Sequence, residues 1–173
     1  MLETFGRPDH VILWQKAAEG VLPDWEVVFD GFVAIIDWPA AAFWHETSDQ
    51  YPDAIVLLAT RSDSDTWWSS ANATIFEILR QEPRAGMEAW HAMWSTIVRE
   101  RFSPNVDNRD AAIAAYEAHN EAVRDAIPAH RLVEWQPSDG WAPLCEALGV
   151  PEPLEAFPHV NTRSQFRSSH GWD

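Results

Sequence analysis

One arginine stands apart from the other Lys and Arg residues in the first half of the chain. Between Lys16 and Arg80 the only such residue is Arg61, which directly follows an apolar run over residues 54–60 that is typical of a buried parallel strand. Ligands of open α/β sheets bind at the carboxyl ends of the strands, and an Arg side chain can hold a phosphate with two parallel hydrogen bonds. The segment after Arg61 carries several hydroxyls and leads into a predicted helix, whose first N–H groups favour an anion. Arg61 is therefore a candidate for binding an anionic ligand.

A structural role for Arg61 is the alternative. Its guanidinium could instead pair with one of three aspartates, namely Asp37, Asp63 and Asp65, while Ser62 caps the following helix in an S-x-x-D pattern. Asp63 and Asp65 also place negative charge beside the candidate site, which disfavours an anion there.

Two further residues are candidates for a general base. Asp37 follows the β-branched end of a predicted extended stretch, so its carboxylate would lie at the rim of a sheet, where it could accept a proton from a hydroxyl. Its alternative role is to cap the helix that begins after Trp38-Pro39. His45 is the second candidate base, because it is the histidine nearest to Asp37 in the sequence. The alternative is that His45 has no catalytic role and lies on an ordinary helix surface.

The remaining reactive residues do not form a catalytic or metal-binding pattern. His91, His119 and His159 lack the H-x-x-x-H and H-E-x-x-H spacings, so no metal site is predicted. His119-Asn120 is predicted to make a buried polar contact. Cys145 is the only cysteine, which excludes an intramolecular disulfide, and it is predicted to be a small core residue.

The elements that must position these residues alternate between helices and strands. The spacing of apolar residues predicts a helix over 10–20, an extended stretch over 27–37, a helix over 40–50 and a strand over 54–60. It also predicts helices over 65–80, 87–102, 109–127 and 141–148, with a short strand over 131–135. This order indicates an α/β fold with a parallel sheet flanked by helices.

Length and charge narrow the class of protein. The 173 residues suffice for one domain, predicted over 1–166, and the tail 167–173 is predicted to be flexible. The 12 Lys and Arg residues against 27 Asp and Glu residues give a net charge of -15, which disfavours binding to nucleic acid and to anionic membranes.

No apolar run approaches the ~20 residues of a membrane span and no secretory signal is recognisable, so we expect a cytoplasmic protein. Most of the 11 tryptophans are predicted to fill the core or to bind a partner helix.

Several short motifs occur in an order that resembles a known family. They are Asp37-Trp38-Pro39-Ala40-Ala41-Ala42-Phe43-Trp44, Tyr51-Pro52-Asp53-Ala54, Arg61 with Trp67 and Ser69, Tyr116 with His119-Asn120, Gly140-Trp141-Ala142-Pro143-Leu144-Cys145, and Phe157-Pro158-His159-Val160-Asn161. Over residues 10–161 this order is similar to the P-loop sulfotransferase-like proteins of bacteria and fungi. The resemblance implies a P-loop NTPase-like fold that transfers a sulfonate group from the donor PAPS to a hydroxyl or amine of a small molecule. In that family an Arg and a Ser eight residues later hold the 3′-phosphate of PAPS, so the resemblance assigns this role to Arg61 and Ser69.

The chain departs from the family pattern around the donor site. The family's usual Arg-Asp-Pro-Glu is replaced by Arg61-Ser62-Asp63-Ser64, which lacks the rigid turn that Pro supplies. The family also has a Gly-rich phosphate loop near its start, whereas all seven glycines of this chain are isolated. We therefore expect an N-terminally incomplete fold with impaired transfer. The alternative is a non-catalytic or truncated module of the same fold that binds a partner or forms homo-oligomers.

Overall fold

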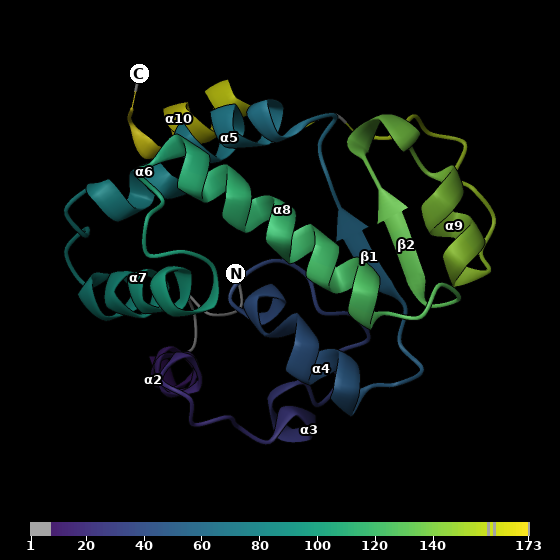
Figure 1. Ribbon diagram of the computed structural model, residues 1–173, viewed down its shortest axis with the longest axis horizontal. Helices are drawn as coiled ribbons and strands as arrows, with labels where there is room; N and C mark the ends of the chain where they lie inside the picture. The colour runs from purple at the N-terminus through teal and green to yellow at the C-terminus, as the bar shows by residue number, and fades with distance from the viewer. Residues whose placement is uncertain (1–7, 159, 161, 173) are drawn as a thin grey trace. The chain divides into compact units, whose positions relative to one another are not determined.

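The computed structural model describes residues 8–158, 160 and 162–172 (Figure 1). The chain divides into two compact units. Unit 1 comprises residues 1–52 and 79–111, and unit 2 comprises residues 53–78 and 112–173. The first seven residues, and His159 and Asn161 of the last family motif, lie outside the described residues.

Unit 1 consists of helices and irregular segments in its described part. Its elements are α2 (Pro8–Ala18), α3 (Trp25–Val28), the 3₁₀-helix η1 (Ala40–Phe43), α4 (Trp44–Gln50) and α7 (Glu88–Arg101). Helix α2 packs against α7, and α7 also contacts η1. These elements confirm the helices predicted over 10–20, 40–50 and 87–102.

The core of unit 1 is built mainly from aromatic rings. Trp14, Trp25 and Phe43 pack with ring centroids 5.5–5.7 Å apart, and the Phe43 side chain is fully buried. Trp90 and Trp94 on α7 are buried as well and stack in nearly parallel planes. The prediction that tryptophans fill the core is confirmed for these four. Their burial removes a large apolar surface from water, which stabilises the unit.

The extended stretch predicted over 27–37 is wrong. Its first two residues, Val27 and Val28, belong to α3. The Asp24 carboxylate caps and thereby stabilises this helix by accepting a hydrogen bond from the Glu26 N–H at 3.0 Å. Gly31 then adopts a positive φ of 79°, and residues 32–36 are exposed and form no strand. The β-branched residues favour a strand only where a neighbouring strand pairs with them. Asp37 therefore does not end a strand.

Unit 2 contains the sheet, which confirms an α/β fold with parallel strands. Strand β1 (Val56–Ala59) pairs with β2 (Leu132–Trp135) in register from Val56 opposite Leu132 to Ala59 opposite Trp135. The other elements of this unit are α5 (Ser64–Asn72), most of α6 (Ile75–Arg80), most of α8 (Arg109–Ala126), η2 (Pro137–Asp139), α9 (Ala142–Leu148) and α10 (Arg163–His170). The two strands lie side by side in Figure 1, and α9 contacts β2.

The burial of β1 differs from the expectation for a strand covered on both faces. Leu58 is buried, whereas Leu57 is 47% exposed and Ile55, just before the strand, is 41% exposed. Only one face of this two-stranded sheet is therefore covered by the described residues at these positions.

The helix predicted over 65–80 is interrupted. It forms α5 and α6 (Ile75–Arg80), which are separated at Ala73 and Thr74. The Thr74 hydroxyl donates a hydrogen bond to the Ser70 carbonyl at 2.7 Å, and the Thr74 N–H bonds to the Ala71 carbonyl three residues back. Such local bonds compete with the regular ladder of an α-helix and end α5.

The carboxyl-terminal segment includes a short helix. In α10 the Thr162 hydroxyl and the Gln165 side chain form a capping box, and Arg167 donates a hydrogen bond to the Ala73 carbonyl at 3.3 Å. Residues 167–170 are thus helical within the tail that the sequence predicts to be flexible. The single domain over 1–166 and the flexibility of 167–173 stay predictions.

Candidate functional site

The candidate anion-binding residue Arg61 lies where the parallel strands of unit 2 end. The Thr60 N–H donates to the Trp135 carbonyl at 2.9 Å, which continues the ladder one residue beyond β1. The next backbone N–H, that of Arg61, donates to the Tyr116 hydroxyl oxygen at 3.3 Å. This bond joins the end of β1 to α8 and holds Arg61 at the carboxyl edge of the sheet, as the sequence predicts.

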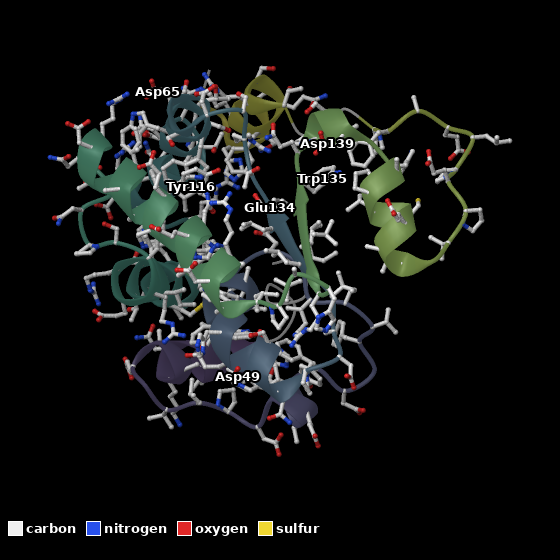
Figure 2. All side chains as sticks on the ribbon, turned by 45° about the vertical axis from the view of Figure 1, so that its right-hand side comes forward. Asp49, Asp65, Tyr116, Glu134, Trp135 and Asp139 are labelled. Carbon is white, nitrogen blue, oxygen red and sulfur yellow. The ribbon has the colours of Figure 1, made fainter. Side chains whose placement is uncertain are left out.

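A cleft of about 280 Å³ opens beside Arg61. Its walls come from the ends of both strands, from the start of α5 and from one face of α8, and Figure 2 labels Tyr116 on α8 and Glu134 on β2. The residues that define its chemistry are Arg61, Asp63, Tyr116, Asn120, Arg124 and Glu134. Charged and polar groups therefore dominate a site at the edge where α/β sheets bind their ligands.

Arg124 and Glu134 form a two-pronged ion pair in the wall of the cleft. The Arg124 guanidinium donates two hydrogen bonds to the Glu134 carboxylate, at 2.9 and 2.8 Å. These bonds lower the pKa of Glu134 and raise the pKa of Arg124. Most of the positive charge of Arg124 is thus already compensated within the protein.

Asp63, and not Ser62, caps α5. Its carboxylate accepts hydrogen bonds from the Thr66 N–H at 2.6 Å and from the hydroxyls of Ser62 and Thr66, each at 2.8 Å. These bonds lower the pKa of Asp63, the Thr66 N–H contributing most. The predicted Ser62 cap is wrong, and the positive end of the α5 dipole is already occupied by an internal carboxylate.

The guanidinium of Arg61 is not used within the described part of the chain. It makes no ion pair there, so the predicted alternatives of pairing with Asp37, Asp63 or Asp65 are not found among the described contacts. Its side chain is exposed and lines the cleft. The positive charge of Arg61 is thus available to a ligand.

Ser69 lies on the exposed surface of α5 and does not line the cleft. Trp67, two residues earlier on the same helix, stacks on the Tyr116 ring with centroids 4.3 Å apart and planes 10° apart. The structure thus brings Tyr116 to Arg61, whereas no described contact joins Ser69 to Arg61.

A family model for the sulfotransferase domain matches residues 1–166 of the 173. The chain belongs to the sulfotransferase-domain family. Ava biosynthesis cluster protein M of Aspergillus versicolor is 31% identical over an alignment 174 residues long, and the alignment covers 89% of this chain and 67% of that protein. The match includes Asp37, His45, Arg61 and Ser69 within its bounds, but it assigns no role to any of them.

The two candidate bases of this sulfotransferase-domain protein lie in unit 1, whereas Arg61 and Ser69 lie in unit 2. Asp37 is exposed with a positive φ of 67°, and its carboxylate accepts a hydrogen bond from the Trp38 N–H at 2.7 Å. His45 is exposed on α4, with Nδ1 3.5 Å from the Asp49 carboxylate. No described hydrogen bond joins Asp37 to His45.

Sequence reasoning missed most of the cleft. Tyr116 is predicted only as a motif residue and Asn120 only as part of a buried polar contact, while no role in the site is predicted for Arg124 or Glu134. The signal was the spacing: Tyr116, Asn120 and Arg124 follow at intervals of four, which places polar groups on one face of an otherwise amphipathic helix.

The described residues contain neither a cluster of metal ligands nor a helix that could span a membrane. Within residues 8–158, 160 and 162–172, no three His, Cys, Asp or Glu side chains are grouped so that they could hold a metal ion. None of the described helices has the length and apolar character needed to cross a membrane.

Proposed function

We propose that this member of the sulfotransferase-domain family binds the donor PAPS through a P-loop NTPase-like fold and transfers its sulfonate group to a hydroxyl or amine of a small molecule. The observation that carries the proposal is the guanidinium of Arg61, which forms no ion pair with a described residue and lines a cleft at the carboxyl edge of the sheet. Arg is well suited to grip the 3′-phosphate of such a donor, because its planar fork matches two phosphate oxygens. Ser69 is the second proposed contact, on the strength of its spacing from Arg61.

Asp37 and His45 are the proposed base candidates. Sulfonate transfer to a hydroxyl requires that the hydroxyl proton is taken up, and both side chains are exposed to solvent. The Asp37 carboxylate has one acceptor position used by the Trp38 N–H, which leaves other lone pairs for a substrate proton. Loss of transfer with retained donor binding in Asp37→Asn or His45→Gln would identify the base.

We expect transfer by this chain to be slow. Three carboxylates line the cleft, namely Asp63, Glu117 and Glu134, against the two arginines Arg61 and Arg124, and the chain carries a net charge of -15. A donor with several negative charges is therefore repelled at long range and is poorly stabilised near the cleft. Weak stabilisation of this kind lowers the rate strongly, because the loss of even one preorganised hydrogen-bond donor in an active site typically costs about 10²–10³ in rate.

The test is sulfonate transfer from ³⁵S-labelled PAPS to a panel of phenols, alcohols and amines. We expect slow transfer by the full chain and none by Arg61→Ala. Arg163→Ala is the matched control, because it removes the same charge from the exposed start of α10. Equal transfer by Arg61→Ala and the unchanged chain would overturn the donor site.

The second candidate function is a non-catalytic module of the same fold that binds ligands or forms homo-oligomers. The exposed apolar side chains around Phe32–Ile36, of which Val33 is 105% exposed, favour self-association. Light scattering that shows a monomer across concentrations would contradict this alternative, whereas donor binding without transfer by an oligomer would favour it.

A further inference from the structure

The side chain of Asn120 is a buried polar group without a protein partner in the described structure. Asn120 is only 6% exposed, and its amide lines the cleft beside Arg61. No described residue forms a hydrogen bond with that amide. The amide atoms of Asn120 are not sealed in the core but are accessible from the cleft, so a ligand that enters the cleft can form hydrogen bonds with them.

The Tyr116 hydroxyl is held in place beside the same cleft. Its oxygen accepts a hydrogen bond from the Arg61 N–H at 3.3 Å, and its ring is stacked on Trp67 with centroids 4.3 Å apart. A phenol that accepts one hydrogen bond still has its own proton to donate. Tyr116 and Asn120 lie one helical turn apart on α8, so both can donate to the same ligand.

The carboxylates in the cleft, in contrast, already accept hydrogen bonds from the protein. Glu134 accepts both hydrogen bonds from Arg124, and Glu117 accepts one from the Ser64 hydroxyl at 2.6 Å. Asp63 accepts three from Ser62 and Thr66. Among the described residues, the Arg61 guanidinium, the Asn120 N–H₂ group and the Tyr116 hydroxyl proton have no described acceptor, so all three can donate to a ligand that supplies acceptor oxygens.

We propose that Asn120 and Tyr116 bind, together with Arg61, a tetrahedral oxyanion group in this cleft, a phosphate or a sulfate. The identification of this group with a phosphate of the sulfonate donor rests on the proposed function. The binding of an oxyanion by these three residues does not, because it follows from the unused donors of the cleft.

The experiment is calorimetric titration of the full chain with four probes: sodium sulfate, inorganic phosphate, adenosine 3′,5′-bisphosphate and adenosine. The variants are Asn120→Ala, Asn120→Asp, Tyr116→Phe and Ser69→Ala. Tyr116→Phe keeps the stacked ring and removes only the hydroxyl. Asn120→Asp keeps the size of the side chain and adds a negative charge, so it provides a second test if Asn120→Ala fails to fold. Tryptophan fluorescence during thermal unfolding shows which variants are folded.

We expect Asn120→Ala and Tyr116→Phe each to weaken binding of the oxyanion probes about tenfold, as for a lost hydrogen bond to a charged group. Asn120→Asp should weaken it further, and adenosine should not bind detectably. If Ser69→Ala weakens binding and the Asn120 and Tyr116 variants do not, the inference is overturned while the proposed donor site stands.

Two other results separate the inference from the proposed function. If inorganic phosphate binds in a way that depends on Asn120 and Tyr116 but the bisphosphate binds no more tightly, the oxyanion site stands and the nucleotide donor is contradicted. If none of the probes binds to the unchanged chain, both are overturned.

Discussion

Arg124 on α8 donates two hydrogen bonds to the Glu134 carboxylate on β2, at 2.9 and 2.8 Å. The pair joins a helix to a strand that follows it in the sequence, and it forms one wall of the cleft beside Arg61. The side chains of Arg124 and Glu134 are 43% and 46% exposed, so water screens their interaction. The pair thus contributes more to the position of Arg124 than to the stability of the fold.

Glu134→Gln should lower the free energy of unfolding at pH 7 by no more than about 1 kcal/mol, as exposed ion pairs do. The pKa of Glu134 is held below its ordinary value of 4.5, mainly by the hydrogen bonds from Arg124. The stabilisation is therefore present above the unfolded-state pKa and is lost as the pH falls through the lower folded-state pKa. Urea unfolding, followed by tryptophan fluorescence, should show a difference at pH 7 that disappears in strong acid. Glu146→Gln, at an exposed position on α9, is the control, and an equal change in both variants would contradict a specific role of the pair.

Phe43→Ala should destabilise the protein by about 3–5 kcal/mol, the usual cost of removing a large aromatic ring from a core. The Phe43 ring is fully buried between Trp14 and Trp25, and the Arg101 guanidinium lies 4.5 Å from its centroid. Val33→Ala is the control, because Val33 is 105% exposed and its loss creates no cavity. Equal midpoints of urea unfolding for the two variants would show that the aromatic cluster does not form the core of unit 1.

The helices were predictable because their signals are local. Residues 87–102 and 109–127 show apolar residues at intervals of three and four, and α7 and α8 form within one or two residues of those bounds. Gly149 ends α9 with a left-handed φ of 64°, as its position predicts. The stretch over 27–37 failed because strand formation depends on a partner from elsewhere in the chain, which β-branched residues alone cannot specify.

The site was only partly predictable for the same reason. The position of Arg61 follows from the end of a strand, which is a local feature of the sequence. Its neighbours Tyr116 and Asn120 are more than 50 residues away, and only the packing of α8 brings them to the cleft. Spacing predicted a Ser62 cap, but the neighbouring Asp63 carboxylate is a strong acceptor and caps the helix instead.

Arg101→Met should destabilise the protein more than Glu46→Gln does. Arg101 forms an ion pair with Glu46, and these side chains are only 27% and 20% exposed. Arg101→Met leaves the Glu46 carboxylate poorly solvated and without its cation, and it also removes the cation from the Phe43 ring. Glu46→Gln, in contrast, leaves a neutral amide at position 46 that can still accept a hydrogen bond from Arg101. A double-mutant cycle from urea unfolding should give a coupling of about 0.5–3 kcal/mol. Additive effects would contradict the pairing.

Asp63→Asn should tighten the binding of an oxyanion in the cleft while the cap of α5 is kept. The Asp63 carboxylate both caps the helix and lines the cleft, so it stabilises α5 but repels an anion near Arg61. An Asn side chain still offers an oxygen to the Thr66 N–H without the charge, whereas Asp63→Ala removes both and should lower the stability of the protein.

Titration with adenosine 3′,5′-bisphosphate at low salt should therefore give a lower Kd for Asp63→Asn than for the unchanged chain. Glu152→Gln removes the same charge from an exposed loop of unit 2 and serves as the matched control. In about 1 M salt the advantage of Asp63→Asn should shrink, because charges are then screened within about 3 Å. An equal gain in Glu152→Gln would mean that only the net charge of the chain matters, and weaker binding by Asp63→Asn would mean that the anion does not bind near Arg61.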